Sequence, residues 1–181
     1  MVFLLLAFPF GALARADRQP ATVQVDRAGA LPLALEPGAF EFRKTKLYFL
    51  ESLRFTRAQP NEERSIAFER KRLLYGAITP NDERDRYGNY FTFFWRANRR
   101  ADLVVRLEYR QQRLGPFVQA REVAYPGALG SFHTEFQVTG DDYLVDGRVT
   151  EWRVLLVERA GAPPGTNSGR IVALGQSYLW R

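Results

Sequence analysis

The 181-residue sequence contains no cysteine. Disulfide bonds, thiol catalysis, covalent haem attachment and cysteine-based zinc sites are therefore excluded. No disulfide can compensate for a weak core, so the fold must be stable through burial of apolar side chains. A chain of this length is long enough to bury such a core in one domain.

Histidine is nearly absent, since His133 is the only one. A histidine-containing metal site would need carboxylates to complete it, and a Ser-His-Asp triad would depend on this one residue. The sequence also lacks the GxSxG, HExxH and phosphate-binding glycine-loop motifs. We therefore predict that the protein is not an enzyme and that it has no catalytic residues, no cofactor and no metal. We interpret His133 as a solvated residue of a strand.

Two acidic clusters have weak metal-site spacing. Asn81, Glu83 and Asp85 alternate as in a calcium loop, but the later glutamate and the internal glycine of such a loop are missing. The aspartates of DDYLVDG (141–147) are interpreted as capping residues of a turn. A carboxylate pair for glycoside cleavage stays open, because such pairs are assembled by the fold.

The sequence has no apolar run of transmembrane length. Its longest run, residues 2–14, has about 13 residues, whereas a membrane-spanning helix needs about 20. The run ends in Ala14-Arg15-Ala16, the small-x-small pattern of a signal peptidase site, although a basic segment before it is missing. We predict a signal peptide over residues 1–16, a mature chain beginning near Asp17 and no transmembrane helix in it. The protein is then exported and either periplasmic or extracellular. A buried N-terminal strand is the alternative.

Alternation of apolar and polar residues predicts β-strands over much of the remaining chain. It is clearest in ADLVVRLEYR (101–110) and SFHTEFQVT (131–139), and segments 115–125, 151–159 and 170–180 are similar. Segments 44–55 and 64–78 are also read as strands, the second bent at Gly76, although 44–55 also suits a helix. ANRRAD (97–102), RLGP (113–116), YPGALG (125–130) and TGDD (139–142) are predicted turns.

This pattern predicts an all-β protein. We expect an irregular lead-in over residues 17–39, with a short edge strand at 22–25, and one domain over 40–181. Seven or eight strands joined by short turns predict an antiparallel two-sheet β-sandwich. It is similar to immunoglobulin and fibronectin domains in architecture only, because no family motif is present.

The segment DRYGNYFTFFWRANRR (85–100) is the most aromatic part of the chain. As a strand it places Phe91, Phe93 and Trp95 on one face and Tyr90, Thr92 and Phe94 on the other. A strand that is apolar on both faces is usually central, so we predict that it lies in the core. Tyr87 and Tyr90 are the rings best placed for contact with a ligand.

Basic residues outnumber acidic ones, with a formal net charge of +6. Arg96, Arg99 and Arg100 cluster at the end of the aromatic strand. Together with Tyr87 and Tyr90 they are the predicted ligand contacts, and loops 79–89, 126–131 and 160–169 are the places to look for a site. Export makes nucleic acid an unlikely partner, and we expect an envelope protein, an anionic surface polymer or lipid headgroups instead. We interpret these arginines, and Arg106, Arg110 and Arg113 with Glu108 on the following strand, as a solvated sheet face.

The sequence thus predicts an exported, non-enzymatic β-sandwich that serves as a binding or structural module of a bacterial-type cell envelope. An alternative is a small outer-membrane β-barrel of about eight strands, favoured by the alternation and by Tyr178 and Trp180 near the end. A third possibility is an envelope hydrolase that uses carboxylates and His133.

Overall fold

Six strands and three helices make up the described part of the chain. The structure, a computed structural model, describes residues 21–25, 28–51, 63–159 and 167–180. The predicted signal peptide therefore lies outside the described residues. The elements are β1 (Val23–Val25), β2 (Phe40–Leu50), α1 (Arg64–Leu73), α2 (Pro80–Arg84), β3 (Gly88–Gln111), β4 (Gln119–Thr139), α3 (Asp141–Asp146), β5 (Val149–Glu158) and β6 (Arg170–Gln176).

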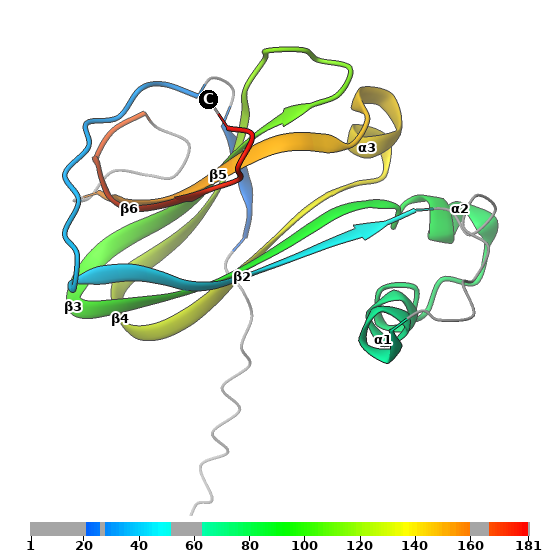
Figure 1. Ribbon diagram of the computed structural model, residues 1–181, viewed down its shortest axis with the longest axis horizontal. Helices are drawn as coiled ribbons and strands as arrows, with labels where there is room; N and C mark the ends of the chain where they lie inside the picture. The colour runs from blue at the N-terminus through cyan, green and yellow to red at the C-terminus, as the bar shows by residue number, and fades with distance from the viewer. Residues whose placement is uncertain (1–20, 26–27, 52–62, 160–166, 181) are drawn as a thin grey trace, which may run out of the picture.

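All six strands belong to one antiparallel sheet built around the long β3–β4 hairpin. The sheet order is β1-β4-β3-β5-β6, and β2 also pairs with β3. The first half of β3 lies between β2 and β4, and its second half lies between β4 and β5. Between the halves the register of β3 against β4 shifts around Ala101. Figure 1 shows that the hairpin bends there, so that the two halves of the sheet face each other.

The prediction of an antiparallel, mostly β fold is confirmed, but a division into two sheets is not. Residues 97–102 and 125–130, predicted as turns, lie within β3 and β4. The backbone there bends without ending either strand, and Gly127 and Gly130 have positive φ angles of 60° and 104° in this part of β4. The two facing layers are consequently continuous through the hairpin.

The main core fills the space between the two halves of the bent sheet. From the first half, Phe91, Phe93 and Trp95 are buried, and the second half contributes residues such as Leu107 and Tyr109. Trp95 stacks on Phe132 with 4.6 Å between ring centroids, and its Nε1 donates a hydrogen bond to Thr134 Oγ1 at 2.9 Å. Each large apolar side chain buried in this way contributes roughly 1.5–3 kcal/mol. The core prediction for this face of the aromatic strand is confirmed.

The opposite face of the second half of β3 differs from the expected solvated face. Arg106 and Glu108 alternate with core residues there, yet their exposed fractions are 0% and 1%. Arg106 Nε donates to Glu122 Oε1 at 2.6 Å, and Arg153 Nε donates to Glu108 Oε2 at 2.6 Å. Arg159 also pairs with Glu122 at 3.0 Å. Charges can be buried here because they alternate in sign and are hydrogen-bonded to one another.

The prediction of a strand over residues 64–78 is wrong, because α1 occupies residues 64–73. The segment AFERKRLL is rich in strong helix formers, and their propensity outweighs the short alternation of apolar residues at its start. The chain does turn at Gly76, where φ is 81°. Helix α2 occupies part of the predicted loop 79–89. Its capping box consists of Thr79 Oγ1, which accepts from Asp82 N, and Asp82 Oδ2, which accepts from Thr79 N.

The remaining strand boundaries agree in part with the sequence. The edge strand predicted at 22–25 is confirmed as β1, and segment 44–55 is a strand up to Leu50. Segment 115–125 enters β4 only at Gln119, and segment 170–180 leaves β6 at Gln176. Residues 141–146 form α3 rather than a turn. Within the described part of the chain, no helix is long and apolar enough to cross a bilayer.

Candidate ligand-binding groove

The second face of the aromatic strand forms the floor of a groove instead of packing into the core. Tyr90, Thr92 and Phe94 point away from the main core and are half-buried. Strand register places a residue of β2 and a residue of β4 beside each of them. The resulting rows are Lys44–Phe94–His133, Lys46–Thr92–Glu135 and Tyr48–Tyr90–Gln137. The groove floor therefore carries both aromatic and charged side chains.

Helix α1 forms the opposite wall of this groove. Figure 1 shows the helix set apart from the sheet, beside the strands of its first half. The groove has a volume of about 700 Å³, within the range of roughly 300–1,000 Å³ for small-molecule sites. Its lining residues are Thr45, Lys46, Leu47, Tyr48, Ser65, Ile66, Phe68, Glu69, Arg72, Leu73, Tyr90, Thr92, Phe94, His133 and Glu135.

Hydrogen bonds rather than apolar packing attach α1 to the rest of the protein. Arg86 donates through Nη1 to the carbonyl oxygens of Leu73, at 2.8 Å, and of Tyr75. The Tyr90 hydroxyl donates to the Arg86 carbonyl at 2.5 Å, which connects this anchor to β3. Tyr48 also donates to the Ile66 carbonyl at 3.4 Å. None of the helix residues is buried. The helix is consequently a cover over the groove and not a part of the core.

Both walls of the groove mix apolar and polar side chains. Ile66, Phe68 and Leu73 supply the apolar part of the helix wall, and Phe68 is 66% exposed. The polar part of this wall consists of Ser65, Glu69 and Arg72. On the floor, the Phe94 ring lies 6.0 Å from the His133 ring and 5.6 Å from Lys46 Nζ. These contacts place two polar groups capable of hydrogen bonding beside an aromatic surface.

Two titratable groups at the groove are held in their ordinary charge states. Burial raises the pKa of Tyr90, which keeps its phenol protonated at neutral pH. The hydrogen bond from Arg72 Nε to Glu69 Oε2, 2.7 Å long, raises the pKa of Arg72. At neutral pH the groove therefore presents a neutral phenol at Tyr90 and a cation at Arg72.

The predicted ligand contacts are distributed over three places. Tyr90 lies on the groove floor, whereas the Tyr87 hydroxyl donates to Glu83 Oε2 of α2 at 3.3 Å. Arg96 is exposed on β3, and Arg99 and Arg100 lie at the bend of the hairpin. The structure therefore does not bring the five residues together in one site, and their role as contacts stays a prediction.

Arg99 is part of a quartet of charged residues, defined by Glu36, Arg99, Glu158 and Arg170. Arg99 donates to Glu158 Oε1 at 2.6 Å and to Glu36 Oε2 at 2.8 Å. Arg170 donates to Glu36 Oε1 at 2.7 Å and to Glu158 Oε2 at 3.0 Å. Each arginine thus bridges both glutamates. The quartet joins the lead-in, β3, β5 and β6, which makes it a clamp at the bend.

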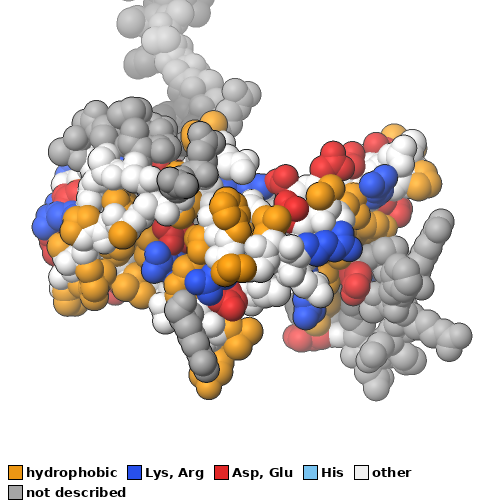
Figure 2. All heavy atoms as spheres, turned by 90° about the horizontal axis from the view of Figure 1, so that it is seen from above, with side chains coloured by type: hydrophobic (Ala, Val, Ile, Leu, Met, Phe, Trp, Pro, Cys, Tyr) orange, Lys and Arg blue, Asp and Glu red, His pale blue; other side chains and the backbone are white. Residues whose placement is uncertain are grey.

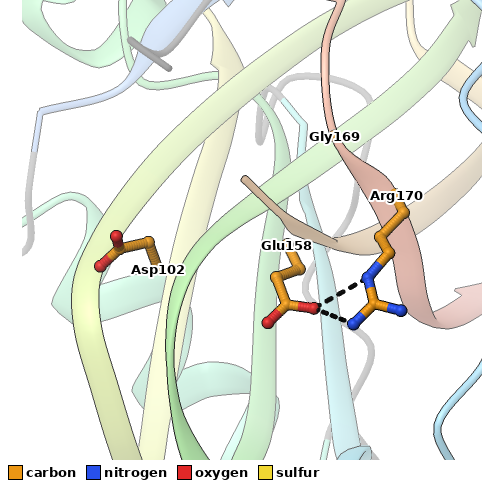
Figure 3. A pocket seen from close by; sticks show the side chains of 4 residues that line it. All are labelled: Asp102, Glu158, Gly169 and Arg170. Carbon is orange, nitrogen blue, oxygen red and sulfur yellow. Dashed lines mark hydrogen bonds and ion pairs between the residues drawn. The ribbon is translucent and has the colours of Figure 1, made fainter. Parts of the chain in front are cut away.

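The quartet borders a second hollow, of about 430 Å³, lined by Asp102, Glu158, Gly169 and Arg170. Figure 3 shows Arg170 turned toward Glu158 and Asp102 standing apart from this pair. Asp102 Oδ1 accepts a hydrogen bond from Gly127 N at 2.7 Å. The hydrogen bond from Arg99 lowers the pKa of Glu158. Because these charged groups already bind one another, the hollow is a weaker ligand-site candidate than the groove.

The described residues contain no group of three or more histidine, cysteine or acidic side chains that could hold a metal ion. The two buried glutamates that might act as a carboxylate pair, Glu108 and Glu122, are bound by arginines on either side. His133 is exposed at the edge of the groove.

The sequence analysis missed the wall of the groove that α1 forms. The signal that could have predicted this helix is the high helix propensity of residues 67–74.

Charge on the upper side of the molecule is mixed. Figure 2 shows acidic and basic side chains interspersed with apolar ones on this face. Among the described residues on this face, neither sign of charge gathers into one large patch. The chain matches no protein-family model, and no curated protein or solved structure shows significant similarity to it. The groove must therefore be interpreted from its own chemistry.

Proposed function

We propose that the protein is an exported, non-enzymatic binding module of a cell envelope, and that the groove under α1 binds a small amphipathic ligand. The observation that carries this proposal is the groove itself. An aromatic strand has one face in the core, while its other face lies open beneath a helix that buries none of its own residues.

Incomplete burial supports a binding role over a purely structural one. A helix that only completed a core would bury an apolar stripe against the sheet. Here Ile66, Phe68 and Leu47 all line the groove, yet their exposed fractions are 41%, 66% and 54%. A ligand lying between α1 and the sheet would remove this apolar surface from water, at about 25 cal/mol per Å².

The groove lining also suggests the class of ligand. An apolar body would pack between Phe68 and Phe94, and a polar end would reach Lys46, His133 or Glu135 on the floor. Lys46 and Glu135 have opposite charges and lie on either side of Thr92 in one cross-strand row. They favour a polar or zwitterionic group over one with a large net charge.

Export rests on the sequence of residues 1–16 and is tested separately. Cells expressing the full chain are fractionated, and the N-terminus of the product is sequenced. We expect a product that begins near Asp17 in an exported fraction. A full-length product confined to the cytoplasm would overturn the export part of the proposal and leave the groove untouched.

Filling the groove tests the binding role. Thr92→Trp places a large ring on the groove floor, and Thr150→Trp makes the same change at an exposed position of β5. The probe is 8-anilinonaphthalene-1-sulfonate, an amphipathic dye, followed by its fluorescence. We expect Thr92→Trp to weaken dye binding at least tenfold and Thr150→Trp to leave it unchanged, with both variants folded by circular dichroism. Equal binding by all three proteins would refute the groove as the binding site.

A further inference from the structure

A second surface of the α1 segment carries alternating basic and aromatic side chains. Four exposed residues follow one another at positions i, i+4, i+7 and i+11 of this segment: Arg64, Phe68, Lys71 and Tyr75. We propose that these residues, called here the basic–aromatic stripe, bind the surface of an anionic lipid membrane. This inference goes beyond the binding of a small ligand and does not depend on it.

Helix geometry places the stripe on one side of α1. At 100° per residue, the four positions fall within about 40–60° of one another. Ile66 and Leu73 lie on the side that faces the groove, so the stripe is directed away from the groove except at Phe68, which stands at its rim. Tyr75 continues the stripe beyond the end of the helix because its N–H still bonds to the Arg72 carbonyl, at 3.3 Å.

The exposure of apolar groups along this segment is high. Phe68 and Tyr75 of the stripe are 66% and 83% exposed, and Ile78, which follows α1 after the turn at Gly76, is 91% exposed. Scattered single apolar residues on a surface need no explanation, but three exposed within eleven residues concentrate apolar surface in one short segment. Exposed aromatic rings favour the boundary between the lipid headgroups and the acyl chains of a membrane.

The charge of the segment is complementary to an anionic surface. Arg64 and Lys71 belong to the stripe, while the only acidic residue of residues 64–78, Glu69, is hydrogen-bonded to Arg72. Each basic residue close to an anionic membrane strengthens binding about fivefold. The combination of cations with exposed apolar rings favours a lipid surface over a hydrophilic anionic polymer, which offers nothing for the rings to enter.

The experiment is co-sedimentation of the full chain with vesicles of phosphatidylcholine alone and with vesicles containing phosphatidylglycerol. One variant is Arg64→Glu with Lys71→Glu, and another is Tyr75→Ser with Ile78→Ser. The matched control is Arg43→Glu with Arg148→Glu, which changes net charge equally at exposed arginines elsewhere. Circular dichroism of each variant, compared with the unchanged protein, shows whether the variant is folded and does not rely on ligand binding in the groove.

We expect binding to the phosphatidylglycerol vesicles only. The charge variant should lose at least about 25-fold in the partition coefficient, since two basic residues contribute about fivefold each. The Tyr75→Ser, Ile78→Ser variant should also bind more weakly, and the control should bind like the unchanged protein. The proposal is overturned if the protein binds no vesicles, if the stripe variants bind normally, or if the control loses as much as the charge variant does. Binding of a soluble anionic polymer without vesicle binding would equally contradict it.

Discussion

Arg106 has a fully buried guanidinium that lies between two glutamates. Its Nε donates to Glu122, and its Nη1 lies 3.5 Å from Glu108. Removal of one partner of a buried ion pair leaves the other charge in a poorly solvated place, which is far more costly than the loss of a surface pair. Stability at this site therefore depends on complete pairing of the charges.

Replacing Arg106 should destabilise the protein strongly. We expect Arg106→Met to lower the free energy of unfolding by about 3–5 kcal/mol, because two buried glutamates each lose one of their arginine partners. Arg72→Met removes a pair whose arginine is 53% exposed, and its expected effect is below about 1 kcal/mol. Urea unfolding at pH 7 measures both. An Arg106→Met variant as stable as Arg72→Met would contradict the importance of this pairing.

At the residue scale the sequence predicted packing better than electrostatics. The alternation of YFTFFW correctly placed Phe91, Phe93 and Trp95 in the core, because a strand alternates its side chains between two faces. The same alternation suggested that Arg106 and Glu108 are solvated. Their burial depends on Glu122 and Arg153, which lie 14 or more positions away along the chain and are brought near only by strand pairing.

The quartet of Glu36, Arg99, Glu158 and Arg170 joins four segments at the bend of the sheet. Its arginines bridge both glutamates, and the Arg99 guanidinium also lies 4.4 Å from the Phe40 ring. The hydrogen bond from Arg99 is the largest cause of the lowered pKa of Glu158. Folding is therefore linked to the ionisation of this carboxyl.

The linkage predicts a pH dependence of stability. The ordinary pKa of Glu158 is 4.5, and its value in the folded protein is lower. The unfolded chain binds the proton more readily, so the contribution of Glu158 is complete above pH 4.5 and is lost as pH falls through the lowered pKa. We expect Glu158→Gln to be less stable at neutral pH and to lose less stability on acidification.

Chemical unfolding from pH 7 to pH 3 measures this effect. The matched control is Glu41→Gln, which alters an exposed pair with Arg43 and should follow the unchanged protein. If Glu158→Gln and the unchanged protein lost the same stability on acidification, the quartet would not hold the ionised carboxylate as described.

The sequence predicted a helix or strand correctly where one hydrophobic periodicity continued over enough residues. Ten residues that alternate with one exception, Val104, identified the second half of β3. The segment over residues 64–73 shows alternation only at Ile66 and Phe68. Its helix propensity then decided the structure. The groove was missed for the same reason, because its second wall was taken for a strand.

The shape of the whole molecule follows from the length of one hairpin. Strands β3 and β4 have 24 and 21 residues, and a flat sheet of that length would leave its apolar face in water. Bending the hairpin at residues 97–101 brings the two halves of this face together. Sequence turn signals at the bend indicated a change of direction, but they did not show that the hydrogen-bonded ladder continues through it.

The bend also determines where ligands can reach the molecule. Because the inner face is filled by the core, the outer face of the first half of the sheet is left to form the groove with α1. Arg99 of the quartet lies at the bend in the middle of β3, and the groove lies over the beginning of the strand, at Tyr90, Thr92 and Phe94. The clamp and the candidate binding site therefore occupy successive parts of the same strand.

The most direct test of the groove is a two-dimensional amide NMR spectrum of the labelled protein, recorded during titration with 8-anilinonaphthalene-1-sulfonate. We predict that the largest shifts occur at Thr92, Phe94 and Glu135 on the sheet and at Phe68 and Leu73 on α1. Residues around the second hollow, such as Asp102 and Gly169, should not shift. Shifts confined to that hollow, or no saturable shifts at all, would contradict the assignment of the groove as the ligand site.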